Sequence, residues 1–297
     1  MTTYNDGMTE AQRQFVHDFQ AFLSSPPADI GALRARIDGF TERFEALSPA
    51  VPRTGGLYPA VRLREGLCAD VVVPPGAGPY PVLLYLHGGG WVAGSPKSHR
   101  RLAQHFAQAG YLTVNLDYRL APEHPFPAGY DDCAFAVEWV RENAVRWNGR
   151  PERLAIGGDS AGANLAAAVA AHSGGVRAAV LIYGIYDFAG AVERGAMGIE
   201  AVARTYLAQG FSAALADPRV SPIRAVSAKF PPAFVTVGSA DALLPESIAM
   251  AAALGAAGVA HESRVAPDMI HGFIQFDMLA ECHRTLAAIF AFLSAHV

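Results

Sequence analysis

Ser160 stands at the centre of the sequence Gly-Asp-Ser-Ala-Gly, residues 158–162, between two segments of different character. An apolar run at residues 153–157 precedes it and predicts a strand, and an alanine-rich stretch from Asn164 to Ala171 follows it and predicts a helix. A serine in a glycine-flanked turn between a strand and a helix has the pattern of a nucleophile elbow. The N-terminus of the following helix favours negative charge there. A serine in this position can attack a carbonyl carbon.

A glycine-rich loop upstream could stabilise the charge that such an attack creates. His-Gly-Gly-Gly-Trp, residues 87–91, directly follows the apolar run 81–86. Backbone N–H groups aimed at a developing oxyanion are worth about 3 kcal/mol each in catalysis. The candidate donors are the amides of Gly89, Gly90 and Ala161. The alternatives are a plain glycine turn or a phosphate-binding loop, and the sequence lacks the G-x-x-x-x-G-K-[ST] pattern of the latter.

A serine hydroxyl needs a neighbouring base, usually a histidine that a carboxylate orients. In hydrolases with this elbow, the acid and then the histidine follow the serine along the chain. The histidines after the serine are His172, His261, His271, His283 and His296. All but one of them fall in a predicted helix or strand. His271 alone lies in a predicted loop, and Gly272 lets the backbone turn its ring toward the serine, so we expect His271 to be the base.

Two aspartates end apolar strands and could orient this histidine. Asp187 follows the run 179–183, and Asp241 follows the run 233–238. We choose Asp241, because it lies one strand before the histidine loop and an apolar turn follows it, which would keep water from its hydrogen bond. Asp187 fits better as a capping residue that opens the next segment.

Together these segments resemble the hormone-sensitive-lipase-like family of bacterial carboxylesterases. The resemblance runs in order from about Leu57 to the C-terminus, and its motifs are His87–Trp91, Asp117–Pro127, Gly158–Gly162 and Ile270–Phe273. It implies an α/β-hydrolase fold, with a mostly parallel central sheet flanked by helices and covered by a helical cap. It also implies a catalytic triad and an oxyanion hole, made respectively by Ser160, Asp241 and His271 and by the amides of Gly89, Gly90 and Ala161.

The sequence departs from the family pattern at two positions beside these motifs. Ala163 stands where the family usually has a second glycine after the elbow, and Ala242 stands where it usually has a proline after the acid. Neither change touches a reacting group. In the segment 118–127, prolines favour an extended path, and Arg119 and Glu123 could pair within it. We interpret this segment as scaffold, and interpret His87 and His99 as hydrogen-bonded supports of the glycine loop.

Two amphipathic helices are predicted before the sheet begins. Apolar residues recur at helical spacing from Thr9 to Leu23 and from Ile30 to Phe44, with Pro26-Pro27 between them. They could pack on the core for stability alone or lie on a membrane surface, but the first lacks flanking lysines. The family resemblance suggests that they cover the serine. We therefore divide the chain into N-terminal cap helices, residues 1–48, and a hydrolase domain, residues 49–297.

A second cap insertion is predicted at about residues 188–222, because this interval is long for a connection between a strand and the next. Its apolar side chains could line the substrate pocket or only hold the cap together: Met197, Ile199, Val202, Tyr206, Leu207 and Phe211. As substrate-binding candidates we name Tyr206 and Leu207 from this set, and Trp91 beside the glycine loop, although a large aromatic is as often part of a core.

The composition indicates a globular enzyme of 297 residues, with 52% hydrophobic and 17% charged residues. A net charge of -4, with no run of lysine or arginine, argues against nucleic-acid partners. The N-terminus is polar and acidic, unlike a signal peptide, and no apolar stretch reaches the roughly 20 residues of a membrane span. Three widely separated cysteines suggest reduced thiols in the cytoplasm. We expect no metal site and no cofactor.

The sequence therefore predicts a serine hydrolase acting on small neutral esters, and the family resemblance suggests short to medium acyl chains and a possible homodimer. Amide or lactone hydrolysis by the same triad is the alternative within this class. A non-catalytic small-molecule receptor is the alternative outside it, because a fold can keep its pocket and lose its chemistry.

Overall fold

The computed structural model describes residues 8–25, 29–50, 53–208 and 210–297. An eight-stranded sheet forms its centre, in the strand order β1-β2-β4-β3-β5-β6-β7-β8. Strand β2 is antiparallel to both of its neighbours, and all the other pairs are parallel. The strands are β1 (Gly56–Arg64), β2 (Leu67–Val73), β3 (Tyr80–Leu86), β4 (Leu112–Asp117), β5 (Gly149–Asp159), β6 (Ala178–Ile182), β7 (Ala233–Gly238) and β8 (His261–Ala266). This architecture confirms the predicted α/β-hydrolase fold.

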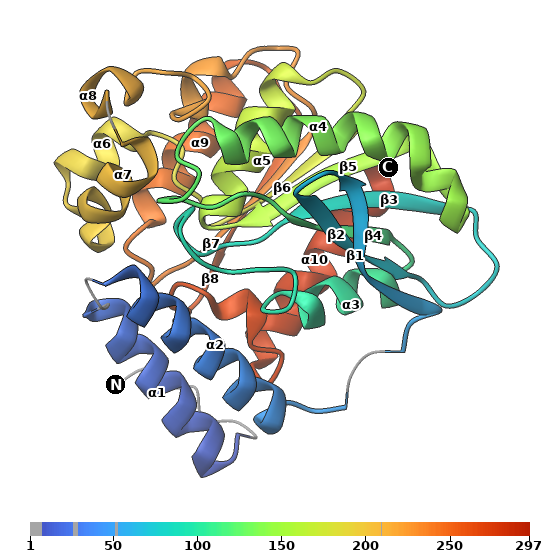
Figure 1. Ribbon diagram of the computed structural model, residues 1–297, viewed down its shortest axis with the longest axis horizontal. Coiled ribbons are helices and arrows are strands. Elements are labelled where there is room, and N and C mark those ends of the chain that lie inside the picture. The colour runs from blue at the N-terminus through green and yellow to red at the C-terminus, as the bar shows by residue number, and fades with distance from the viewer. Residues whose placement is uncertain (1–7, 26–28, 51–52, 209) are drawn as a thin grey trace.

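Helices cover both faces of the sheet. The helices that cover the two faces are α3 (Arg100–Gln108), α4 (Ala128–Asn143), α5 (Ala161–His172), α9 (Leu244–Ala256) and α10 (Ala280–His296). Figure 1 shows α4, α5 and α9 above the sheet and α3 and α10 below it. Short 3-10 segments join these elements at Ala144–Trp147, Pro222–Ala225 and Phe273–Gln275. Because the inner strands are covered on both sides, they are almost uniformly apolar and buried rather than alternating.

The N-terminal segment forms the two predicted helices, α1 (Glu10–Ser24) and α2 (Ile30–Leu47). Thr9 begins α1 with a capping box shared with Gln12, and the Asp29 side chain caps α2 by accepting from the Ala32 amide at 2.7 Å. The apolar stripe of each helix is buried. Residues 1–7 and Pro26-Pro27 lie outside the described residues, as do residues 51 and 52 of the predicted linker at 49–56.

The predicted insertion at 188–222 is helical as well. It contains α6 (Phe188–Glu193), a 3-10 segment at Ala196–Gly198, α7 (Ile199–Leu207) and α8 (Phe211–Ala214). Residue 209, between α7 and α8, lies outside the described part. In Figure 1 this insertion and the pair α1 and α2 lie on the same side of the sheet, with the insertion above and the helix pair below.

One predicted contact in the segment 118–127 is wrong. Arg119 does not pair with Glu123 but forms a bidentate ion pair with the buried Asp132 of α4, at 2.8 Å for each nitrogen. Glu123 instead binds Arg34 of α2. The expected pair does not form because helices α4 and α2 each bring a partner of opposite charge to this segment. These partners are distant in sequence but lie close to Arg119 and Glu123 in the fold.

Candidate active site

Ser160 occupies the sharp turn between β5 and α5. Its backbone has φ of 54° and ψ of -118°, a strained combination for a residue with a side chain. The flanking glycines are required by close packing on β3. A Cβ on Gly162 would lie 1.9 Å from the Leu86 carbonyl oxygen, and one on Gly158 would lie 2.5 Å from the same atom. The turn therefore holds the serine side chain at the carboxyl end of the sheet.

The structure brings Ser160, His271 and Asp241 together from three separate loops. His271 Nε2 lies 2.9 Å from Ser160 Oγ, and His271 Nδ1 lies 2.9 Å from Asp241 Oδ2. The other oxygen of Asp241 accepts the Leu243 amide at 2.8 Å, and the residue is only 5% exposed. Because Asp241 accepts a hydrogen bond from the Nδ1–H group of His271, the unprotonated Nε2 is left to accept the serine proton.

The electrostatics of the site act on the histidine in opposite directions. Burial of His271 lowers its pKa, but the adjacent Asp241, through its charge and its hydrogen bond, and the charge of Asp159 together raise the pKa above its ordinary value of 6.5. The imidazolium form is thus favoured by two carboxylates. This arrangement suits a base that must hold a proton during the reaction.

The remaining candidates of the sequence analysis lie elsewhere. Three histidines contact carbonyl groups of their own segments: His172 with Ala168, His261 with Val259 and His283 with Asp277. The His296 ring is tilted against the Phe292 ring, with ring centres 4.5 Å apart. Asp187 occupies the N-cap position of α6, as expected, but its side chain makes no capping hydrogen bond.

The glycine loop presents its backbone to the serine. Gly89 and Gly90 have φ of 124° and 64°, and a Cβ on Gly89 would lie 2.1 Å from the Ala93 carbonyl oxygen. Among the described residues, no acceptor binds the amides of Gly89 and Gly90 or the amide of Ala161 at the start of α5. The Gly88 amide, by contrast, donates to Asp159 Oδ1 at 3.1 Å.

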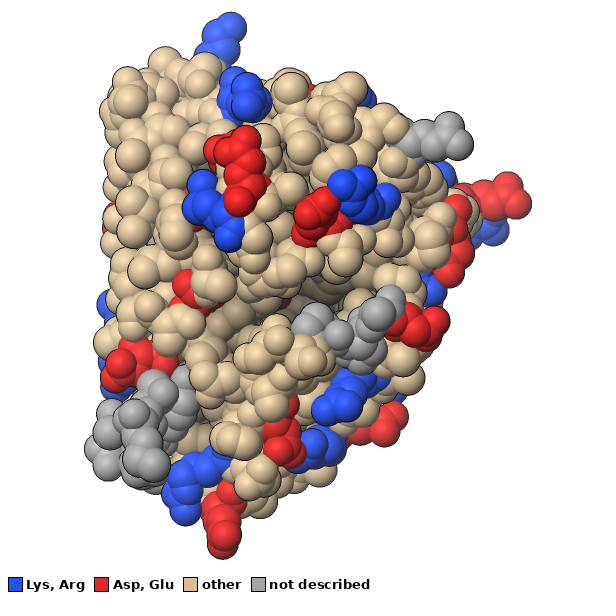
Figure 2. Space-filling view, turned by 90° about the vertical axis from the view of Figure 1, so that its left-hand side faces the viewer, with Lys and Arg blue, Asp and Glu red and all other residues tan. Residues whose placement is uncertain are grey.

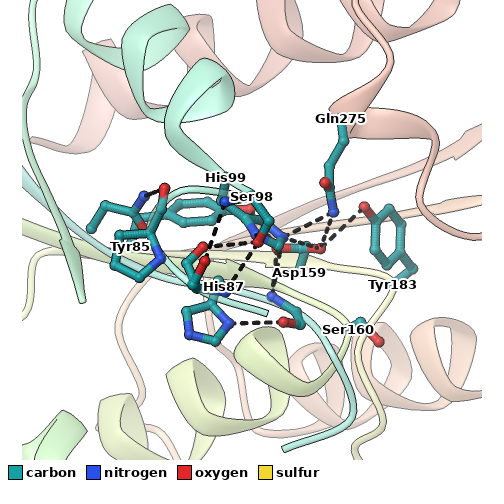
Figure 3. A network of polar contacts seen from close by, with 12 residues as sticks. Tyr85, His87, Ser98, His99, Asp159, Ser160, Tyr183 and Gln275 are labelled. Carbon is teal, nitrogen blue, oxygen red and sulfur yellow. Dashed lines mark hydrogen bonds and ion pairs between the residues drawn. The ribbon is translucent and has the colours of Figure 1, made fainter. Parts of the chain in front are cut away.

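His87 and His99 lie where the supporting role predicts. His87 Nδ1 is 2.8 Å from the Gly88 carbonyl oxygen, and His99 Nε2 is 3.3 Å from the Gly88 amide nitrogen. Figure 3 shows both side chains in the polar network that lies next to Ser160. Burial lowers the pKa of His87 to about 3, so this ring is neutral.

A pocket with a volume of about 200 Å³ opens onto Ser160 and His271. Six phenylalanines from α1, α2 and the loop after His271 form one part of its wall: Phe15, Phe19, Phe22, Phe40, Phe44 and Phe276. Figure 2 faces this side of the molecule and shows a hollow bordered mainly by uncharged surface. The sequence indicated the apolar stripes of α1 and α2, but periodicity alone gave no reason for them to face the serine.

The insertion contributes to this pocket through residues other than those chosen. Trp91 lines the pocket, as do Met197, Ile199 and Val202, whereas Tyr206 and Leu207 are not part of its described lining. The Tyr206 ring stacks on Trp91, with ring centres 4.7 Å apart. Leu207 is buried inside the cap. The prediction for these two residues is wrong because the first turn of α7 faces the pocket, whereas its last turn faces the interior of the protein.

Within the described residues, no cluster of His, Cys, Asp or Glu side chains could hold a metal ion. A search of the same residues finds no helix with the length and apolar character needed to span a bilayer.

A serine, histidine and aspartate joined at the carboxyl end of a mostly parallel sheet define the class of α/β hydrolases. A family model for the alpha/beta hydrolase fold matches residues 83–275. The chain belongs to this family, in its hormone-sensitive-lipase-like branch of carboxylesterases.

Individual relatives agree with this assignment. The chain is 34% identical over 220 residues to "Carboxylesterase NlhH" of Mycobacterium tuberculosis, covering 67% of this chain and 68% of the relative. It is 34% identical over 281 residues to "Carboxylic ester hydrolase LipN" of the same organism, covering 84% and 72%. An esterase structure from Pyrobaculum calidifontis superposes with a TM-score of 0.82 at 27% identity, over 97% of this chain and 98% of that one.

Proposed function

We propose that this protein is a serine carboxylesterase that hydrolyses short- to medium-chain esters through an acyl-enzyme on Ser160. The observation that carries this proposal is the 2.9 Å separation between Ser160 Oγ and His271 Nε2, backed by Asp241 on the far nitrogen. The carboxylesterase relatives support the same bond type.

In the first half of the reaction, Ser160 Oγ attacks the ester carbonyl carbon while His271 Nε2 takes its proton. The amides of Gly89, Gly90 and Ala161 donate to the oxyanion of the tetrahedral intermediate. His271 then gives the proton to the leaving alcohol, and the acyl group stays on the serine. In the second half, a water molecule attacks the acyl-enzyme with the same base, and the carboxylic acid leaves. Asp241 keeps the imidazole in the required tautomer throughout.

The size and lining of the pocket support small neutral esters. Its aromatic wall adjoins Ser160 and carries no Lys or Arg among its described residues, so an acyl or alkyl group gains by apolar burial while a charged group would lose its hydration. A series of p-nitrophenyl esters from acetate to decanoate tests this proposal. We expect kcat/KM to rise with acyl chain length until the chain fills the pocket, and to fall for longer chains.

Covalent labelling tests the mechanism separately. An aryl phosphonate should add one phosphonyl group to Ser160, found by peptide mass spectrometry, and Ser160→Ala should abolish both labelling and hydrolysis. An unlabelled serine in folded protein would favour the non-catalytic receptor. Amide and lactone hydrolysis would follow from the same triad, so the matching anilide and lactone are assayed in parallel. If the ester were the slowest of the three, the carboxylesterase assignment would fail.

Two finer points stay part of the proposal. We place the enzyme in the cytoplasm, supported by the free thiols of Cys68, Cys133 and Cys282, the latter two buried. We also propose a homodimer, supported by the family resemblance and by β8, which pairs with β7 on one side and forms an edge of the sheet. Fractionation and analytical ultracentrifugation test these two points.

A further inference from the structure

Asp159 lies directly before the nucleophile and is buried, with 1% of its surface exposed. Five donors from four segments converge on its carboxylate (Figure 3). They are the Tyr85 hydroxyl at 2.9 Å, the Gly88 amide at 3.1 Å, His99 Nε2 at 3.1 Å, the Gln275 side-chain amide at 3.2 Å and the Tyr183 hydroxyl at 3.5 Å. We call this group the Asp159 network.

The glycine loop rests on this carboxylate without any intervening side chain. A Cβ on Gly88 would lie 2.6 Å from Asp159 Oδ2 and 3.1 Å from the Asp159 carbonyl oxygen. Gly88 immediately precedes Gly89 and Gly90, whose amides face the reacting carbonyl in the proposed mechanism. The position of the carboxylate therefore fixes the origin of the oxyanion loop.

The same carboxylate also reaches the segment that carries the base. Gln275 follows His271 by four residues, at the end of the short 3-10 turn Phe273–Gln275. Its side-chain nitrogen lies 3.2 Å from Asp159 Oδ2 and 2.9 Å from His99 Nε2. One buried group thus joins the nucleophile, the oxyanion loop and the histidine loop.

We propose that Asp159 is a positioning residue for ester hydrolysis: its carboxylate sets the oxyanion loop through Gly88 and the histidine loop through Gln275 relative to the serine beside it. This inference rests on the proposed function. It adds a second carboxylate to the machinery, one that acts through these two loops and not through a hydrogen bond to the imidazole.

The charge of Asp159 is what separates this role from plain packing. Burial raises the pKa of Asp159, but His99 and the Tyr85 hydroxyl outweigh it and leave the pKa below its ordinary value, so the group is ionised at neutral pH. A buried carboxylate costs solvation free energy that a neutral side chain would not. Its field also acts on His271, which becomes an imidazolium in the transition state.

No other charged group replaces that field. His271 faces Ser160, Asp241 and the ring of Tyr183, whose centre is 4.6 Å from the imidazole. Burial raises the pKa values of Tyr85 and Tyr183 well above the ordinary value, so both phenols are neutral. Within the described surroundings, the negative charge near the imidazole comes from Asp241 and Asp159.

Asp159→Asn tests the inference, because it removes the charge and keeps the size. We expect kcat to fall by about 10- to 100-fold for p-nitrophenyl acetate and hexanoate alike, with KM within about twofold, as for a misplaced catalytic group. The midpoint of the kcat/KM pH profile should move downward, since His271 loses one of its two stabilising charges. A matched control is Asp70→Asn.

Asp70 is a suitable control because it is another buried aspartate, 4% exposed, on β2. It binds Arg100 at 2.8 Å and the Ala60 amide at 3.0 Å. Asp70→Asn removes the same charge from another buried ion pair, so kcat and the pH midpoint should stay at wild-type values even if the protein loses stability. Thermal unfolding followed by circular dichroism reports the folded fraction of each variant.

Gln275→Met removes only the link between Asp159 and the histidine loop. It tests the positioning role of Asp159 even if Asp159→Asn does not fold. It keeps the length of the side chain and removes the amide, so kcat should fall by about threefold to tenfold with KM and the pH midpoint unchanged. In the double variant, the combined loss should be smaller than the product of the two, because both act through one contact.

Wild-type kcat in folded Asp159→Asn or, where that variant is unfolded, in Gln275→Met would overturn the inference. So would a loss that appears only in KM, or one that Asp70→Asn reproduces. Failure of the proposed function looks different: the wild-type protein itself would then neither hydrolyse the esters nor accept the phosphonate label.

Discussion

The layer beneath Ser160 and the cap above it are stabilised by different kinds of contact. Beneath the serine, the polar atoms of the Asp159 network are buried and bound to one another by directional hydrogen bonds. Above it, α1 and α2 meet the core mainly through phenylalanine rings, such as Phe15 against Phe276 with centres 5.3 Å apart. Directional bonds fix where the reacting groups lie, whereas ring packing leaves room for acyl groups of different length.

Asp241, the proposed acid of the triad, gives the largest expected effect and tests the polar layer. Asp241→Asn should lower kcat by about 10⁴-fold, because the amide would favour the wrong tautomer of His271. Asp187→Asn is the matched control, since this half-buried aspartate also follows an apolar strand but makes no contact with the histidine. Steady-state kinetics on p-nitrophenyl butyrate measures both. The reverse ranking would mean that the acid has been misassigned.

The pH profile tests the same layer by titration. The pKa of His271 is raised, so its protonated form persists above the ordinary value of 6.5, and that form cannot accept the serine proton. The rate should therefore be low at pH 5 and increase with pH, with the midpoint of kcat/KM above 6.5. Measurement from pH 5 to 9 at constant ionic strength is sufficient. A profile that is flat from pH 5 to 8 would contradict the role of His271.

The cap should respond in selectivity rather than in chemistry. Phe19 lines the pocket, and its ring lies 4.9 Å from that of Phe276 and 5.2 Å from that of Phe40. Phe19→Leu should change kcat/KM for the hexanoate by about tenfold relative to the acetate, the order of effect of a methylene in an apolar pocket. The acetate rate should change by less than about twofold.

A phenylalanine outside the pocket provides the control for that variant. Phe290 of α10 is also half-buried and packs edge-on against Phe106, with ring centres 5.5 Å apart. Phe290→Leu should leave the ratio of the hexanoate and acetate rates unchanged. If both variants shifted this ratio equally, the selectivity could not be attributed to the cap.

The sequence predicted the helices and strands well, but it was less informative about the side-chain contacts between them. The strand, turn and helix around Ser160 were predictable because glycine spacing and apolar runs are local signals. The approach of His271 and Asp241 to the serine followed from chain order and loop position, and the structure places all three within contact distance. Pairings between distant segments were less accessible to sequence reasoning.

Tyr206 and Glu123 illustrate this limit. The apolar side chains of α7 have one periodicity whether they face a pocket or a core, so the pattern could not separate Val202 from Tyr206. Glu123 had an arginine four residues away in sequence, yet an arginine from α2 is the one that reaches it. The Asp159 network was hidden for the same reason, because its donors come from four separate segments.

Arg34 joins the cap to the layer beneath it, because its side chain makes directional hydrogen bonds from α2 to the core. From α2 its side chain donates to the Val92 carbonyl at 2.7 Å and to the Ala121 carbonyl at 3.0 Å, and it binds Glu123 through two contacts of 2.8 Å. Val92 lies two residues beyond Gly90. The docking of α2 is therefore linked to the loop that carries the proposed oxyanion amides.

Arg34→Ala should loosen the cap and have the smallest effect on rate. We expect hydrogen exchange in α1 and α2 to accelerate by about tenfold, which corresponds to about 1.4 kcal/mol for hydrogen bonds from a charged donor. We expect kcat/KM to fall by about threefold, because the aromatic contacts of α1 and α2 remain. Exchange mass spectrometry and ester kinetics provide the two measurements.

Arg36→Ala is the control on the same helix. Arg36 is exposed and lies 5.9 Å from the centre of the Phe40 ring, and within the described chain it makes no hydrogen bond to the core. Its removal should alter neither exchange nor rate. High salt distinguishes the contributions further, because it screens the exposed pair with Glu123 more than the bonds to the two carbonyl groups. If 1 M salt reproduced the whole effect of Arg34→Ala, the carbonyl bonds would contribute nothing, and the cap would be held to the oxyanion loop by charge alone.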